Sequence, residues 1–97
     1  MPHYISFLRY TQKGIESVKQ SPSHLDAAKK LFESHGGKMK TFYLTLGQYD
    51  AIVISEFPND ESYAKAALAA GSEGNVHTET LRTFTEDEYR KLIHSLA

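Results

Sequence analysis

The spacing of apolar residues in this chain switches repeatedly between a period of two, typical of strands, and a period near 3.6, typical of helices. The strand pattern occupies residues 3–10, 38–46, 51–57 and 75–84. The helical pattern begins near residues 21, 59 and 85. The predicted order is therefore strand, helix, strand, strand, helix, strand, helix. Its first six elements are those of a ferredoxin-like β-α-β-β-α-β unit, an α+β fold in which both helices cover one face of the sheet.

The third predicted strand reads Ala-Ile-Val-Ile-Ser-Glu-Phe, so apolar residues point to both of its faces. This pattern is typical of a central strand that is covered on both sides. The short link at residues 47–50 predicts that strands two and three form a hairpin. The chain has 97 residues, which is enough for one domain, and we expect residues 1–97 to form it.

Each predicted helix has a start signal. Ser21 or Ser23 can cap the first helix, whose apolar face contains Leu25, Ala28, Leu31, Phe32 and His35. Asn59 or Asp60 can cap the second, which we expect to turn small residues inward: Ala64, Ala67, Leu68 and Gly71. Thr85 and Glu88 have the spacing of a capping box before the C-terminal helix.

Both faces of the predicted sheet carry apolar residues. Strict alternation along the first two strands puts Tyr4, Leu8, Tyr10, Met39 and Tyr43 on one face, and Ile5, Phe7, Phe42 and Leu44 on the other. One face is covered by the helices, and the other needs a cover of its own. The simplest cover is the same face of a second subunit, helped by the C-terminal helix. The sequence therefore predicts a homodimer or a higher homo-oligomer, arranged as a dimeric α+β barrel.

Composition excludes several classes of protein. The formal net charge is -1 and no basic stripe is present, so we expect no nucleic-acid binding. No stretch approaches the roughly 20 apolar residues that cross a bilayer, and we expect no membrane partner. There are no cysteines, and the five histidines lie on separate elements or far apart on one helix. We therefore expect no metal and no cofactor. With no signal-peptide pattern, the expected location is the cytoplasm.

The motifs resemble those of a known family. Gly-Gln-Tyr-Asp stands at residues 47–50, Arg-Tyr-Thr at residues 9–11 precedes Gly14, and Thr-Glu-Thr-Leu-Arg occupies residues 78–82. This combination resembles the GYD-domain proteins, which are small, mostly bacterial and placed among ferredoxin-like dimeric α+β barrels. The resemblance runs from about Tyr4 to Tyr89 and implies fold and assembly, with no catalytic role to transfer. The family often has an arginine where this chain has His77, which weakens any anion contact there.

The turn at residues 47–50 has a structural interpretation and a functional one. Gly47 can supply a positive φ, Asp50 can bond turn backbone, and Tyr49 can anchor the turn against the sheet edge. The same residues can belong to a binding site, because binding residues concentrate on loops held by a rigid scaffold. We expect the structural role to dominate.

A second group of candidates is rich in hydroxyls. It comprises Tyr4, Ser6, Tyr10, Thr41, Tyr43 and Thr45, with Arg9 and Glu56 nearby on their strands. Such a face suits a partly wet dimer interface or a small-molecule pocket, and the interface is favoured. The candidate ligand-binding residues are Tyr4, Arg9, Tyr43, Tyr49, Asp50, Glu56 and His77. No catalytic residue is identified.

Three functions remain open from the sequence. The first is a small dimerisation or regulatory domain that binds a small metabolite in the cleft facing the sheet. The alternative is a cofactor-independent enzyme, since related dimeric barrels include monooxygenases and isomerases. Its acid or base would come from Tyr43, Tyr49, His77 or Glu56, gathered in a buried cleft. The third is a structural subunit of a larger assembly.

Overall fold

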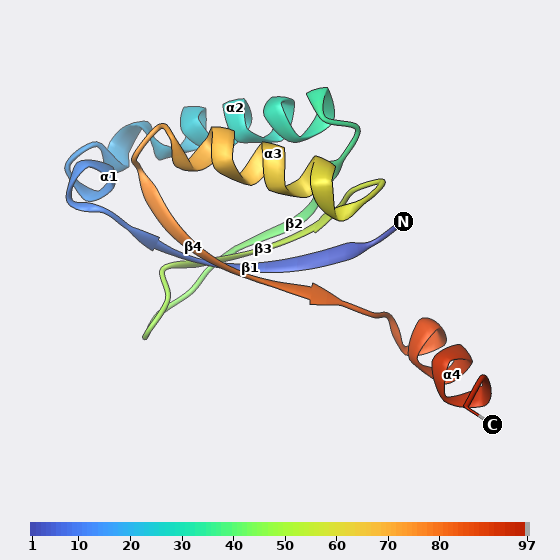
Figure 1. Ribbon diagram of the computed structural model, residues 1–97. Coiled ribbons are helices and arrows are strands. Elements are labelled where there is room, and N and C mark those ends of the chain that lie inside the picture. The colour runs from blue at the N-terminus through green and yellow to red at the C-terminus, as the bar shows by residue number, and fades with distance from the viewer. Residues whose placement is uncertain (97) are drawn as a thin grey trace.

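The structure is a computed structural model that describes residues 1–96 (Figure 1). Its elements are β1 (His3–Tyr10), α1 (Gln12–Glu16), a 3-10 turn (Val18–Gln20), α2 (Ser21–Ser34), β2 (Lys38–Leu44), β3 (Ala51–Glu56), α3 (Asp60–Gly71), β4 (Val76–Thr83) and α4 (Glu86–His94). The predicted order of strands and long helices is confirmed. The short helix α1 and the 3-10 turn are additional elements between β1 and α2.

The four strands form one sheet in the order β2-β3-β1-β4, and every neighbouring pair is antiparallel. The predicted hairpin between β2 and β3 and the central position of β3 are confirmed. Figure 1 shows α1, α2 and α3 on one side of the sheet, which we call the helix face. We call the opposite side the open face.

An irregularity in β2 changes which of its side chains meet the core. The pairing of β2 with β3 shifts between Met39 and Thr41, so Lys40 is an extra residue in the strand. Because a bulge interrupts the alternation, Met39 and Phe42 both pack against the core under the helices. The prediction that placed these two residues on opposite faces, from strict alternation, was wrong.

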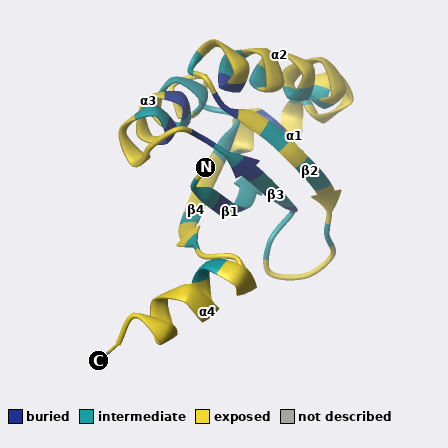
Figure 2. Ribbon diagram, turned by 90° about the vertical axis from the view of Figure 1, so that its right-hand side faces the viewer, coloured by how far each residue is buried: buried dark blue, intermediate teal, exposed yellow. Residues whose placement is uncertain are grey.

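The core lies between the helix face and the helices α2 and α3. It contains Tyr4, Phe32, Val53, Phe57, Tyr63 and Ala66. Four of these are aromatic, and Phe57 meets Phe32 and Tyr63 edge to face at centroid distances of 5.2 and 5.3 Å. In Figure 2 the buried colour is concentrated on the central strands and on the sides of α2 and α3 that face them.

The orientation of α3 differs from the prediction. Its buried residues are Tyr63 and Ala66, whereas Ala64 is exposed and Leu68 is 76% exposed. The prediction followed the small residues and missed the aromatic ring one position earlier. Tyr63 takes the inward position because its ring stacks on Tyr4 at a centroid distance of 4.3 Å.

The helix starts were partly predicted. Asn59 caps α3, because its side chain accepts a hydrogen bond from the Ser62 amide at 2.8 Å. Thr85 and Glu88 form the predicted capping box of α4. The prediction for α2 was wrong: the residue before the helix is Gln20, which makes no side-chain cap, and Ser21 is already helical. The preceding 3-10 turn runs directly into α2 and leaves no extended position for a serine cap.

The C-terminal helix α4 stands apart from the rest of the fold. Figure 1 shows it beyond the end of β4, with none of the other helices beside it, and Figure 2 shows it almost wholly exposed. All described side-chain hydrogen bonds and ion pairs of residues 86–95 are made within residues 85–95. Its apolar stripe is exposed and consists of Tyr89, Leu92, Ile93 and Leu96. The chain does not fold this helix back over its own sheet.

Candidate functional site

The open face of the sheet has an apolar centre. Ile5 on β1 lies between Ile54 on β3 and Leu81 on β4, so three large apolar residues form a row across three strands. Phe7 and Ile52 are paired in the next row. These residues are half-buried, apart from Leu81, which is 55% exposed. No helix among residues 1–96 covers them (Figure 1).

The turn between β2 and β3 places Tyr49 at one end of this face. Gly47 has a φ of +125°, as predicted, and this opens the turn. The Tyr49 ring lies on Phe7, with a centroid distance of 4.9 Å, and under the Arg9 guanidinium, whose carbon is 4.6 Å from the ring centre. Tyr49 therefore anchors the turn over the open face rather than at the edge of the sheet.

Arg9, Tyr49 and Glu79 form a polar cluster around that ring. Arg9 donates from Nε to the Gln48 carbonyl at 2.9 Å, and its Nη1 lies 3.5 Å from Glu79 Oε1. The Tyr49 hydroxyl donates to Glu79 Oε2 at 2.9 Å. This hydrogen bond to a carboxylate is the main reason that the pKa of Tyr49 is raised. The cluster keeps Tyr49 protonated and its ring fixed.

Asp50 ties the same turn to β1. Its Oδ2 accepts a hydrogen bond from the Tyr10 amide at 2.9 Å, and its own amide donates to the Leu8 carbonyl at 2.8 Å. Its carbonyl accepts from the Thr45 amide at 3.0 Å. We expected Asp50 to bond backbone within the turn, and its carboxylate instead bonds the neighbouring strand. Asp50 thus fixes the turn against the centre of the sheet.

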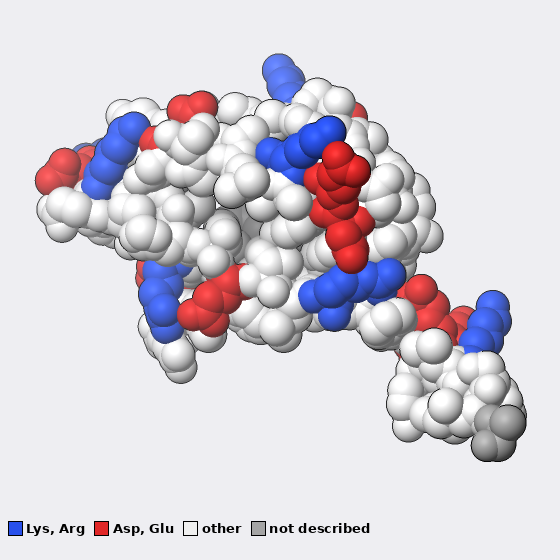
Figure 3. Space-filling view, in the orientation of Figure 1, with Lys and Arg blue, Asp and Glu red and all other residues white. Residues whose placement is uncertain are grey.

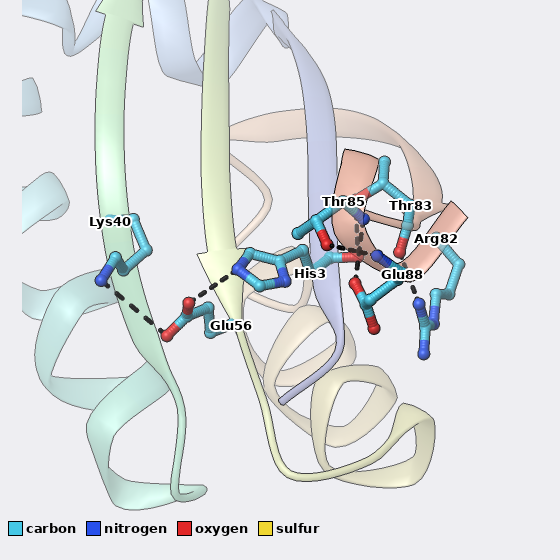
Figure 4. A network of polar contacts seen from close by, with 7 residues as sticks. All are labelled: His3, Lys40, Glu56, Arg82, Thr83, Thr85 and Glu88. Carbon is cyan, nitrogen blue, oxygen red and sulfur yellow. Dashed lines mark hydrogen bonds and ion pairs between the residues drawn. The ribbon is translucent and has the colours of Figure 1, made fainter. Parts of the chain in front are cut away.

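A second polar cluster lies at the other end of the open face (Figure 4). Glu56 stands between His3 and Lys40: its Oε1 is 2.7 Å from His3 Nε2, and its Oε2 is 3.9 Å from Lys40 Nζ. The other ring nitrogen of His3 is buried with no partner among residues 1–96. Beside it, the His3 carbonyl accepts from the Thr83 hydroxyl at 3.1 Å, near the start of α4. Charged groups therefore flank the apolar centre at both ends.

The structure separates the hydroxyl-rich group expected from the sequence. Tyr4 is 2% exposed in the core under the helices, and Ser6 is also buried on the helix face. Thr41 and Tyr43 lie on the open face, since they pair with Ile54 and Ile52. The expectation that these hydroxyls share one face was wrong, because the extra residue in β2 reverses the alternation after it.

Sequence reasoning missed a buried hydroxyl cluster between the sheet and α3. Ser6, Tyr63 and Thr80 lie within 2.6 to 3.1 Å of one another, oxygen to oxygen. Next to it the Tyr4 hydroxyl donates to Asp60, and burial together with this bond raises the pKa of Tyr4 to about 12. The sequence would have revealed this cluster only if Tyr63 had been placed on the inward side of α3. This cluster holds α3 on the sheet.

The candidate acid–base residues are spread over the open face. Tyr43 is 59% exposed, Glu56 is paired with His3, Tyr49 is bonded to Glu79, and His77 is exposed beside Arg9. Within residues 1–96 no hydrogen bond or ion pair joins any two of these four residues. The geometry within one chain therefore gives no assembled acid–base pair from this set.

In the part of the chain that the structure describes, no three histidine or carboxylate side chains gather closely enough to hold a metal ion. That the protein needs no metal stays a prediction. Across residues 1–96, no helix combines the length and the apolar character that crossing a bilayer requires.

The family model described as "GYD domain" matches residues 4–93. The chain belongs to the GYD-domain family. Three residues of the Gly-Gln-Tyr-Asp motif, Gly47, Tyr49 and Asp50, fix the turn over the open face and against β1.

Two proteins of the bacterium Thermus thermophilus are similar to this GYD-domain chain. One is described as "Glutamine synthetase and cystathionine beta-lyase binding protein" and is 29% identical over 82 residues, which are 84% of this chain and 86% of that protein. The other is the crystal structure of TTHA0845, with a TM-score of 0.56, 16% identity, and coverage of 88% of this chain and 95% of that one. At this identity the second comparison supports the fold alone.

Proposed function

We propose that this GYD domain is a small binding domain that pairs with a second copy of itself through the open face and docks on the subunits of a metabolic enzyme. The observation that carries the proposal is the uncovered row Ile5, Ile54 and Leu81 at the centre of the sheet. Apolar surface of this kind is stabilised when it is removed from water. Two open faces packed together form the dimeric α+β barrel expected from the sequence.

The charge pattern of the open face fits a self-complementary interface. Its apolar centre is bordered by Arg9 and Glu79 at one end and by Lys40 and Glu56 at the other. Each end holds both a positive and a negative group, so neither end repels its copy in a two-fold pair. A polar rim around an apolar core is the usual anatomy of such interfaces.

The position of α4 supports the same assembly. This helix leaves the sheet at Phe84, which is 56% exposed, and carries its apolar stripe away from its own domain. A helix with an uncovered stripe is stabilised by packing on another surface. In the paired state we place α4 against the partner subunit, beside the edge of the barrel.

The enzyme partner is proposed from the relative. That protein is named for binding glutamine synthetase and cystathionine β-lyase, and it aligns with most of both chains. The exposed helices and strand ends of the pair would supply the docking surface. A small metabolite held between the two sheets, near Arg9, Tyr43, Tyr49, Glu56 and His77, completes the proposal. Surface plasmon resonance with purified glutamine synthetase and cystathionine β-lyase from the source organism tests the partner directly.

The open face is tested by two matched substitutions. Ile54→Lys puts a charge at the apolar centre, and Leu68→Lys puts the same charge on the outer side of α3, where Leu68 is 76% exposed. We expect Ile54→Lys to be monomeric in light scattering and Leu68→Lys to remain paired. Circular dichroism would show that both fold. A paired, folded Ile54→Lys variant would contradict the proposed interface.

A further inference from the structure

A large cavity lies on the helix face, on the other side of the sheet from the proposed interface. It has a volume of about 1050 Å³ and runs between the sheet and the segment from α1 to α2. Ligand sites for small molecules usually measure about 300–1,000 Å³. The cavity is therefore large enough for a small organic molecule. The proposed pairing through the open face does not use this cavity.

The walls of the cavity are mainly apolar. From below it is lined by Leu8, Met39 and Val53 of the sheet, and from above by Leu25, Ala28 and Leu31 of α2. The three α2 residues are only partly buried, although they form the predicted inward face of that helix. The inward face of α2 is thus apolar but does not pack fully against the sheet. An apolar ligand would complete this packing.

The polar groups around the cavity select the head group of such a ligand. Three acidic side chains line it: Glu16, Asp50 and Glu73. Among the lining residues that the structure describes, the one lysine or arginine is Lys13, which is exposed and donates from Nζ to the Glu73 carbonyl at 2.7 Å. An anionic head would therefore meet more negative than positive charge, whereas a neutral donor or a cation would be attracted.

Asn75 points to the same preference. It lines the cavity, and its side-chain oxygen is buried with no partner among residues 1–96. A buried acceptor without a partner destabilises the fold until a donor reaches it. The hydroxyl cluster of Ser6, Tyr63 and Thr80 is already internally bonded and leaves this demand unmet. Asn75 is therefore a buried acceptor in a residue that lines the cavity, and a donor that reached it would be stabilised there.

We infer that the cavity between α2 and the sheet binds an apolar molecule that carries a neutral or cationic hydrogen-bond donor, such as a long-chain or aromatic alcohol or amine. The site is separate from the open face, so a paired domain would carry one such ligand in each subunit. In Figure 3 the charged side chains lie scattered around the surface, and uncharged atoms dominate the region between the helical layer and the sheet.

Three probes of equal chain length test the head group. Decylamine, 1-decanol and decanoate are titrated below their aggregation limits, and binding is followed by calorimetry and by methyl NMR spectra of the unmodified protein. We expect saturable binding of the amine and the alcohol, with one molecule per chain, and weaker binding of decanoate. Shifts should fall on Leu8, Leu25 and Val53 and spare Ile5 and Ile54. No saturable binding, tighter binding of decanoate, or shifts confined to Ile5 and Ile54 would overturn the inference.

A matched pair of variants tests the location. Ala28→Phe fills the cavity from α2, and Ala64→Phe adds the same ring on the exposed side of α3. We expect the affinity for 1-decanol to fall by about tenfold or more in Ala28→Phe, a loss of about 1.4 kcal/mol or more, and to hold in Ala64→Phe. Equal affinity in both folded variants would place the ligand elsewhere. If Ala28→Phe does not fold, the NMR shifts of the unmodified protein decide the question.

Discussion

Replacing Gly47 by alanine should destabilise the domain through backbone strain alone. A Cβ built on Gly47 meets no atom within 4 Å, so the substitution creates no steric clash. The φ of +125°, however, lies where residues with a side chain are rarely found. The turn cannot relax freely, because Thr45 and Asp50 are hydrogen-bonded across it and Tyr49 is packed on Phe7. The strain must therefore be stored or the turn must open.

Strain of this kind costs about 1–3 kcal/mol. For a domain of this size, each kcal/mol lowers the melting temperature by roughly 4–8 °C. We therefore expect Gly47→Ala to melt several degrees below the parent, and Gly47→Val to melt lower still because a β-branched residue tolerates a positive φ worst. The melting temperatures must be compared at one protein concentration, since pairing would make them depend on concentration.

Two other glycines provide controls for the same substitution. At Gly71, the last residue of α3, an added Cβ also meets nothing within 4 Å, and φ is not positive. Gly71→Ala should leave the free energy of unfolding unchanged or raise it by up to about 1 kcal/mol. At Gly14, φ is not positive, but an added Cβ would lie 2.0 Å from the Asn75 carbonyl oxygen. Gly14→Ala should destabilise at least as strongly as Gly47→Ala, for a purely steric reason.

The three alanine substitutions separate backbone strain from steric clash as the reason that a glycine is needed. If Gly47→Ala has the same melting temperature as the parent and as Gly71→Ala, the turn does not require glycine and the strain argument is wrong. We expect Gly47→Ala to lower stability and Gly71→Ala not to. We expect Gly14→Ala to lower it further. This order would show that Gly47 is needed for its positive φ and Gly14 for the lack of space beside Asn75.

Three further outcomes follow from particular contacts. Tyr49→Phe should change the melting temperature little, because the ring keeps its place on Phe7 and only the exposed bond to Glu79 is lost; a large drop would show that the hydroxyl is structural. The pKa of Tyr4 is raised from 10.0 to about 12, so the folded state favours the protonated form. The stability that the protonated Tyr4 hydroxyl contributes is complete below pH 10 and should be lost as the pH rises towards 12. Urea titrations at increasing pH should show a smaller loss of stability in Tyr4→Phe than in the parent. Thr85→Ala removes the cap of α4 and should cost about 0.5–2 kcal/mol of helix stability, visible as lower helical circular dichroism; an unchanged spectrum would mean that packing alone holds α4.

The order of elements could be predicted from the sequence because each strand and helix has its own apolar period. The Ala-Ile-Val-Ile run of β3 required apolar neighbours on both faces, and β3 is a central strand. The start of α4 was clear because Thr85 and Glu88 satisfy each other within one turn of helix, independently of the rest of the fold. Local chemistry determines these features, so a local pattern reveals them.

The arrangement of the candidate site could not be predicted in the same way. The extra residue Lys40 depends on how β2 pairs with β3, which no local sequence pattern reports. It moves the β2 side chains from Thr41 onward to the face opposite the one that strict alternation predicts. The inward position of Tyr63 depends on a stacking partner, Tyr4, that is distant in the sequence. The amphipathic pattern of α4 shows which of its sides is apolar, but not where the helix lies relative to the sheet. These misses arise where long-range packing overrides the local period.

The molar mass of the unmodified protein at micromolar concentration tests the central proposal most directly. Sedimentation equilibrium or light scattering should give about twice the chain mass of 10.9 kDa, or a higher even multiple. A mass of one chain at every concentration up to the millimolar range would contradict the paired open faces. In that case the row of Ile5, Ile54 and Leu81 would remain exposed to water, and the proposed function would lose its basis.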